Sequence, residues 1–139
     1  MADAALLKKL LVKPGQRILV LNAPAGYIAR LTPLPDDATV AETPDGAYDA
    51  VHAFVGSQAD LARLWPTARA AIQPGGLMWL AYPKKSSGIK TDIHRDAGWD
   101  VVAADQWTGV TQIAIDDTWS ALRFRAYKEG EQPFTGGTS

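Results

Sequence analysis

Continuous apolar runs alternate along the chain with amphipathic segments, and this order predicts an α/β protein. Leucines at helical spacing indicate a short opening helix around residues 6–11. The run Arg17-Ile-Leu-Val-Leu-Asn22 follows, and it is typical of a strand that helices cover on both faces. A brief helix at 27–31, a weak strand at 38–42 and a stronger strand at 48–55 are predicted next.

The second half of the chain continues the alternation. Its predicted elements are a helix at 58–72, a Pro-Gly-Gly turn at 73–76, a strand at 77–81 and a helix at 91–104. Pro66 lies inside the first of these helices and is expected to kink or split it. Thr91 or Asp92 is the expected cap of the second.

Two strand-like segments end the pattern, Val110 to Ile115 and Thr118 to Arg125, joined by the polar turn Asp116-Asp117. They predict an antiparallel hairpin. The whole order predicts a Rossmann-like, mostly parallel open sheet with this hairpin at its edge, in a three-layer α/β/α arrangement. The link between 38–42 and 48–55 is too short for a crossover helix, so the direction of the strand at 38–42 stays open.

Composition narrows the class of protein. The chain has 139 residues, 47% of them hydrophobic, which fits one domain, expected at 1–128, followed by a flexible polar tail at 129–139. The net charge of -1 argues against a general nucleic-acid binder. The chain has no cysteine, no long apolar run and no export signal at its start, so we expect a cytoplasmic protein that does not enter a membrane.

Four loops are expected to meet where the parallel strands end, the edge at which such sheets bind ligands. They are residues 22–26, 55–57, 83–91 and the 116–117 turn. The third loop carries lysines and serines and leads into a predicted helix, a combination that favours a small anion. The candidate ligand-binding residues are Asn22, Gly26, Lys84, Lys85, Ser86, Ser87, Lys90, Asp116, Asp117 and Trp119. The alternative interpretation is that the lysines are only solvated. The two aspartates could pair with the lysines and close the rim, or could simply make the turn.

Other chemical patterns are weaker. Ser87 and Lys90 fit Ser-x-x-Lys, a spacing that arises often without function. His52 falls in a predicted buried strand and His94 in the first turn of a predicted helix, so a core and a surface histidine are expected and no metal site. Trp119 follows the hairpin turn, where it could stack on a planar ligand or cover the sheet edge.

The layout resembles class I S-adenosylmethionine-dependent methyltransferases. That family combines an apolar strand and a glycine-rich turn with an aromatic-Asp-x-Val strand, a Pro-Gly-Gly turn and an edge hairpin. The matching segments here are 14–26, Tyr48-Asp-Ala-Val51 and 73–77, and the likeness covers most of residues 10–126. Segments 82–92 and 116–125 are also similar to a family of short bacterial proteins labelled as a domain of unknown function.

The sequence departs from the methyltransferase pattern at the cofactor turn. Asn22 replaces the usual acid, Pro24 removes an N–H donor, and Gly26 is the only glycine left. The family also has a further strand and helix that this chain lacks room for. Glu42 lies where an acid would meet ribose hydroxyls, although a surface glutamate explains it as well.

These observations favour a non-catalytic methyltransferase-like domain, without a cofactor, that binds a small anionic ligand or a protein partner. The alternative is an active methyltransferase with an abbreviated pocket, in which Gly26 and Glu42 bind S-adenosylmethionine. A structural or oligomerisation module is a third hypothesis. The sequence specifies neither the ligand nor the oligomeric state.

Overall fold

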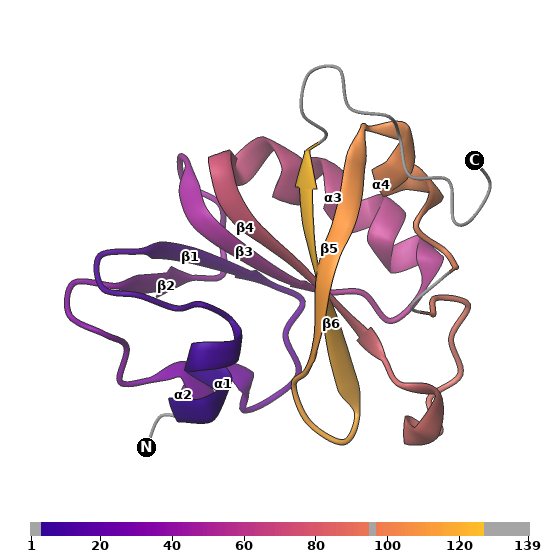
Figure 1. Ribbon diagram of the computed structural model, residues 1–139, viewed down its shortest axis with the longest axis horizontal. Coiled ribbons are helices and arrows are strands. Elements are labelled where there is room, and N and C mark those ends of the chain that lie inside the picture. The colour runs from indigo at the N-terminus through magenta and orange to yellow at the C-terminus, as the bar shows by residue number, and fades with distance from the viewer. Residues whose placement is uncertain (1–3, 95–96, 127–139) are drawn as a thin grey trace.

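The protein forms a six-stranded sheet with helices on both faces (Figure 1). The computed structural model describes residues 4–94 and 97–126, so the predicted tail at 129–139 lies outside the described residues. The helices are α1 (Ala4–Lys9), α2 (Tyr27–Leu31), α3 (Gln58–Ala71) and α4 (Asp100–Ala104), with a 3-10 turn, η1, at Lys85–Ser87. The strands are β1 (Arg17–Leu21), β2 (Thr39–Ala41), β3 (Tyr48–Phe54), β4 (Ile72–Pro83), β5 (Trp107–Ala114) and β6 (Trp119–Ala126). Within these ranges no helix is long and apolar enough to cross a membrane.

The strand order is β2-β1-β3-β4-β6-β5. Strands β2, β1, β3 and β4 are parallel, and β6 is antiparallel to both β4 and β5. The prediction of a mostly parallel Rossmann-like sheet with an antiparallel edge hairpin is confirmed. Because β5 runs in the direction of the parallel strands, the turn between β5 and β6 lies at the edge where those strands end. We call this the carboxyl edge.

Two apolar cores account for the three layers. Leu19 and Leu21 of β1 pack in the core on the α3 and α4 side. Ile18 and Val20 of the same strand pack in the core on the α1 and α2 side. Successive side chains of a strand point to opposite faces, so a strand covered on both faces must be apolar throughout. The run at 17–22 therefore predicted this burial correctly.

The structure resolves the direction of β2, which is parallel to β1. The chain reaches β2 through α2 and then returns to β3 by a loop without a helix. Since β1 lies between β2 and β3, this loop passes the first residue of β1, Arg17. The Arg17 guanidinium donates hydrogen bonds of 2.6 Å to the carbonyls of Asp45 and Ala47 and lies 4.3 Å from the centre of the Tyr48 ring. The Arg17 side chain thus holds the loop between β2 and β3, which contains no crossover helix.

The predicted Pro-Gly-Gly turn is a bulge inside β4. Tyr48 pairs with Ile72 and Ala50 with Leu77, so residues 73–76 lie opposite Asp49 alone. The Asp49 carboxylate accepts hydrogen bonds from Gln73 Nε2 at 2.7 Å and from the Arg17 backbone N–H at 2.8 Å. The aspartate of the Tyr-Asp-Ala-Val segment therefore joins β1, β3 and β4 at their starts.

The predicted helix at 91–104 is mostly wrong, because only Asp100–Ala104 is helical among its described residues. Ile93 is fully buried and ties this segment to the core on the α3 side. Gly98 has φ +98°, which a right-handed helix does not allow. Burial of one side chain and a left-handed glycine therefore prevent the helix. By contrast, α3 continues through Pro66 without being split.

Candidate functional site

The loop at residues 83–91, called the lysine loop below, and the hairpin turn at residues 116–117 are neighbours at the carboxyl edge, as the sequence predicted. Pro83, the last residue of β4, pairs with Trp119, the first residue of β6. The Lys84 backbone N–H donates a hydrogen bond of 2.8 Å to the carbonyl of Thr118. Figure 1 shows η1 and the β5–β6 turn at the same lower end of the molecule.

Asn22 connects the first predicted loop to the same edge. Its Nδ2 donates a hydrogen bond of 2.8 Å to the carbonyl of Phe54, the last residue of β3. Asn22 has φ +59°, a left-handed conformation that asparagine tolerates better than most residues. Asn22 thus fixes the ends of β1 and β3 to each other.

A row of aromatic rings lies beside this edge, on the α2 face of the sheet. The rings of Tyr27 and Phe54 meet edge to face with centroids 4.6 Å apart, and those of Phe54 and Trp119 do so at 5.1 Å. Trp119 is partly exposed and packs on the core behind it. Trp119 thus packs against Phe54 and the core on the α2 side, and its stacking on a planar ligand stays a prediction.

Asp116 has two structural partners. Its Oδ1 accepts hydrogen bonds of 2.8 Å from the backbone N–H groups of Thr118 and Trp119, and its Oδ2 pairs with Arg30 of α2 at 3.0 Å. Partial burial acts to raise the pKa of Asp116, but the bonds from Trp119 and Thr118 and the Arg30 charge outweigh it and hold the pKa below its ordinary value. Asp116 therefore makes the turn and pairs with arginine, not with the lysines.

The serines of the lysine loop divide into two kinds. The Ser87 hydroxyl donates to the Lys84 carbonyl at 2.7 Å and accepts from the Ile89 N–H at 3.1 Å. These local bonds shape η1 and occupy the hydroxyl, so the Ser87-x-x-Lys90 spacing here belongs to a turn. Ser86 is exposed. No helix follows this loop directly, which removes the backbone donors that the sequence analysis expected from a helix start.

The lysines of this loop keep uncompensated charges. Lys85 and Lys90 are exposed and Lys84 is partly exposed. The ion pairs found among residues 4–94 and 97–126 join arginines to aspartates, and none of these pairs includes Lys84, Lys85 or Lys90. Asp117 is exposed on the adjoining turn.

Asp92 closes the start of α3. Its Oδ1 accepts a hydrogen bond of 2.8 Å from the Gln58 backbone N–H, and its own carbonyl accepts one of 2.9 Å from Gln58 Nε2. Ser57 caps the same helix by accepting from the Asp60 N–H at 3.2 Å. Asp92 is thus a cap for a helix 34 residues away along the chain and not for its own segment.

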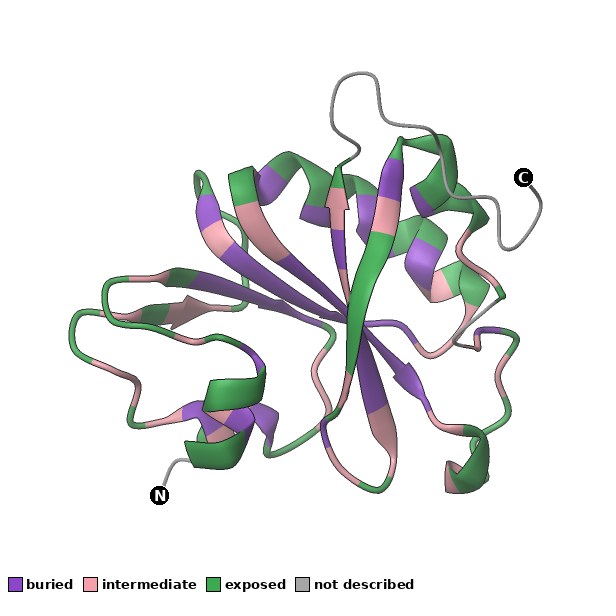
Figure 2. Ribbon diagram, viewed as in Figure 1, coloured by how far each residue is buried: buried purple, intermediate pink, exposed green. Residues whose placement is uncertain are grey.

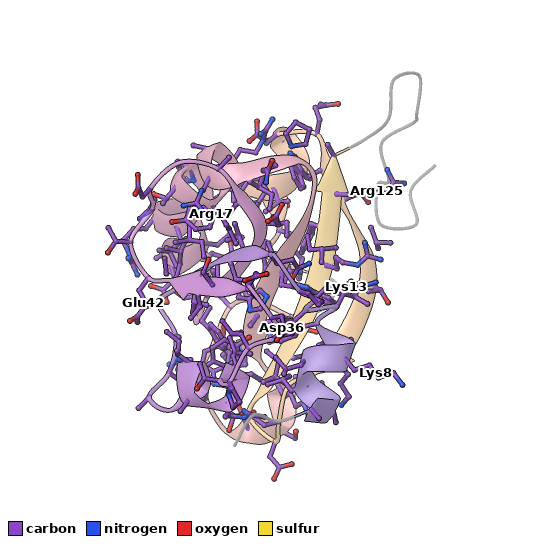
Figure 3. All side chains as sticks on the ribbon, turned by 90° about the vertical axis from the view of Figure 1, so that its left-hand side faces the viewer. Lys8, Lys13, Arg17, Asp36, Glu42 and Arg125 are labelled. Carbon is purple, nitrogen blue, oxygen red and sulfur yellow. The ribbon has the colours of Figure 1, made fainter. Side chains whose placement is uncertain are left out.

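Gly26 and Glu42, the residues of the alternative cofactor site, follow two neighbouring strands, β1 and β2. Gly26 has φ +85°, and a Cβ built on it would meet no atom within 4 Å. Ala41 pairs with Leu19, so Glu42 lies level with Val20, roughly 7 Å short of Asn22 at 3.3 Å per residue. Glu42 is exposed, and Figure 3 shows its carboxylate at the outer margin of the molecule.

Tyr27 and His52 form a buried polar pair that the sequence analysis missed. The Tyr27 hydroxyl and His52 Nδ1 share a hydrogen bond of 2.9 Å, and His52 Nε2 is buried without a hydrogen-bond partner. Burial lowers the pKa of His52 to about 4 and raises that of Tyr27. The sequence predicted a core histidine, but nothing in its spacing pointed to a tyrosine 25 residues earlier.

The second histidine does not lie in a helix. His94 forms an isolated bridge with Ala97, and its carbonyl accepts a hydrogen bond of 2.8 Å from Trp99 Nε1. Among the residues that the structure describes, no group of three or more histidines, aspartates or glutamates is arranged to hold a metal ion.

Comparison with known proteins identifies the fold. No family model matches the sequence, and no curated protein matches it. DhpI in its complex with SAH superimposes with a TM-score of 0.55 at 15% identity, over 88% of this chain and 83% of that one. The ribosomal protein L11 methylase of Lactobacillus delbrueckii subsp. bulgaricus gives 0.56 at 14% identity, over 89% and 77%. The Methanococcus jannaschii fibrillarin pre-rRNA processing protein gives 0.58 at 17% identity, over 84% and 69%.

These similarities establish a methyltransferase-like Rossmann fold, similar in structure to class I methyltransferases at low sequence identity. Sequence identities of 14–17% show that the fold is shared and nothing more.

Proposed function

We propose that this protein is a methyltransferase-like domain that binds a small anionic ligand at its carboxyl edge and does not transfer methyl groups. The observation that carries the proposal is the contrast between two sets of charges at this edge. Asp116 is paired with Arg30, whereas Lys84, Lys85 and Lys90 have no acidic partner among the described residues. The three lysines outnumber Asp92 and Asp117, the acids of this edge that lack a cationic partner among those residues. A site that attracts anions needs such uncompensated positive charge.

The cofactor turn supports the non-catalytic part of the proposal. Asn22 offers no carboxylate, and its side-chain amide is already bonded to Phe54. Pro24 has no N–H to offer a ligand. The Ser87 hydroxyl is held in local hydrogen bonds and is not paired with a base.

The lysines favour a small anion over a protein partner. They lie on a short turn at the end of a strand, and the described apolar side chain exposed beside them is Ile89, at 44%. A protein interface normally has a larger apolar centre.

Melting curves in phosphate or sulfate test this proposal. We expect either anion to raise the melting temperature of the wild type by a few degrees, as anything that binds the folded state does. The combined variant Lys84→Ala/Lys85→Ala should lose most of this shift. Lys13→Ala, which removes an exposed lysine elsewhere, is the matched control and should keep it. An equal response of all three proteins would contradict the proposal.

S-adenosylmethionine binding is the second candidate function. The open space beside Gly26, the exposed Glu42 that follows β2 and the fold itself favour it. Calorimetric titration with S-adenosylmethionine and S-adenosylhomocysteine separates the two functions. Micromolar binding that Glu42→Ala abolishes, and that Asp36→Ala on a nearby exposed loop leaves intact, would replace our proposal with this one.

A further inference from the structure

Helix α2 is a short element with a polar contact at each end. It has five residues, and no side chain caps its first turn. At its start, the Tyr27 hydroxyl and His52 Nδ1 of β3 share their hydrogen bond of 2.9 Å. Near its end, Arg30 pairs with Asp116 at 3.0 Å and donates to the Ile115 carbonyl at 3.1 Å. The helix therefore joins the middle of the sheet to the hairpin at the carboxyl edge.

The contact at the start of α2 is sealed from water. Tyr27 and His52 each have 2% of their surface accessible, and Figure 2 shows the middle of the sheet, including β3, in the purple of buried residues. His52 Nε2 has no hydrogen-bond partner among the described residues. A protonated imidazole carries an N–H on both ring nitrogens, so protonation would place a charge here with a buried donor that has no acceptor. Only the neutral ring suits the packed helix.

The surroundings of His52 offer no negative charge to a protonated ring. Its neighbours on the adjoining strands are Val20 and Trp79. The charged groups on the elements around it are Arg30 of α2, Lys8 and Lys9 of α1, Arg123 of β6 and Asp116 of the hairpin turn. All but Asp116 are positive, and Asp116 is already paired with Arg30. Burial is accordingly what lowers the pKa of His52 to about 4.

We propose that α2 is an acid-sensitive latch, a helix that leaves the sheet when His52 takes up a proton, while the strands stay paired. The strands need not separate, because backbone ladders join β3 to β1 and β4 and its other face packs in the core beside α3. Release of α2 takes Arg30 away from Asp116 and frees the loop at 22–26, so acid loosens one side of the carboxyl edge. The latch does not depend on anion binding by the lysine loop.

The direction of the effect follows from the proton balance. With α2 packed, the pKa of His52 is about 4, and once water reaches the ring it returns toward 6.5. Between these values the open state binds a proton that the closed state does not, so opening becomes more favourable as the pH falls below 6.5. From pH 7 to pH 5 the equilibrium constant for opening should rise about twentyfold. Asp116 stays ionised over this range, since its pKa lies below its ordinary value.

Single buried cysteines test the latch, because the chain has no cysteine of its own. Leu31→Cys places a thiol in α2 and Leu61→Cys places one in α3, at leucines with 0% and 1% of their surface accessible. Dithiodipyridine labels each thiol at pH 7 and pH 5, and each rate is divided by that of the same protein unfolded in urea. This ratio should be at least about tenfold larger for Leu31→Cys than for Leu61→Cys, because α2 opens without global unfolding. It should rise about twentyfold from pH 7 to pH 5.

The histidines supply the matched controls. Adding His52→Gln to Leu31→Cys should abolish the rise with acid, whereas adding His94→Gln should leave it. Equal ratios for the two cysteines, a ratio for Leu31→Cys that does not change with pH, or a rise that survives His52→Gln would each overturn the proposal.

Amide hydrogen exchange of the wild type is a second measurement that needs no variant. The Arg30 N–H donates to the Gly26 carbonyl at 3.3 Å, and the Val55 N–H donates to the Ala81 carbonyl at 2.8 Å within the sheet. After correction for the intrinsic effect of pH, the protection of Arg30 should be lower than that of Val55 and should fall about twentyfold from pH 7 to pH 5. Equal protection of the two amides would mean that α2 opens only when the whole protein unfolds, which contradicts the latch.

Discussion

The Asn22 side-chain amide lies 2.8 Å from the Phe54 carbonyl and donates a hydrogen bond to it, which joins the ends of β1 and β3 at the carboxyl edge. Asn22→Asp would replace this donor with an acceptor facing an acceptor. The free energy of unfolding should fall by about 1–3 kcal/mol. Because aspartate also tolerates a left-handed φ, backbone strain contributes little. Urea denaturation measures the change, and Asn22→Gly, which leaves no charge beside the carbonyl, should cost less. An Asn22→Asp protein as stable as the wild type would show that the bond is unimportant.

The buried His52 predicts a stability that depends on pH. Its pKa is about 4 in the folded protein and 6.5 in a model peptide, so between these values the unfolded chain binds a proton that the folded chain does not. The free energy of unfolding therefore has its full contribution from neutral His52 above pH 6.5, and this contribution is lost as the pH falls toward 4. Between pH 7 and pH 5 the loss should be about 2 kcal/mol. Urea denaturation at both pH values measures it. His52→Gln should remove most of the loss, whereas His94→Gln should retain it.

The hydrogen bonds of Asp116 predict different effects for the two aspartates of the hairpin turn. Asp116→Ala removes the acceptor for two backbone N–H groups and the partner of Arg30, so it should lower the free energy of unfolding by about 1–2 kcal/mol. The exposed Asp117 is the control, and Asp117→Ala should change stability by less than about 0.5 kcal/mol. Chemical denaturation compares the two. Equal effects would mean that the turn depends on neither side chain.

Two glycines with positive φ should differ in their tolerance of alanine. At Gly98, with φ +98°, a Cβ would lie 3.0 Å from both the Asp92 carbonyl oxygen and Ile93 Cγ1. Gly98→Ala should therefore cost about 2–4 kcal/mol, from strain and from displacement of the segment that caps α3. At Gly88, φ is +80° and a Cβ meets nothing within 4 Å, so Gly88→Ala should cost about 1 kcal/mol. Melting temperatures of the two variants give the comparison. A milder effect at Gly98 than at Gly88 would contradict the crowding argument.

Local patterns succeeded where one physical requirement decides the conformation. The strand at 17–21 needs apolar residues on both faces, and a continuous run can serve little else at that length. The apolar runs at 48–55 and 118–125 placed β3 and β6 close to their observed bounds, and the turn signals around 27–31 did the same for α2. The proximity of Lys84 and Thr118 could also be predicted, because the direction of each strand determines the edge at which its loop emerges.

The helix expected at 91–104 failed because a distant partner was decisive. Thr91 and Asp92 look like caps of the segment that follows them, yet Asp92 binds Gln58 and Ile93 is buried in the core that α3 also lines. Neither contact could be predicted from the sequence around residues 91–104. The Tyr27–His52 pair is similar, since its members lie on different elements and meet only when α2 packs on the sheet.

By itself, the sequence determined the α/β layering, the hairpin at the sheet edge and the loops that gather at the carboxyl edge, because periodicity and strand direction depend on near neighbours in the chain. Only the tertiary structure decided the parallel direction of β2, the partners of Asp92, Asp116 and His52, and which lysines remain uncompensated. Those features depend on which groups from separate elements come within hydrogen-bonding distance, and packing alone sets such distances.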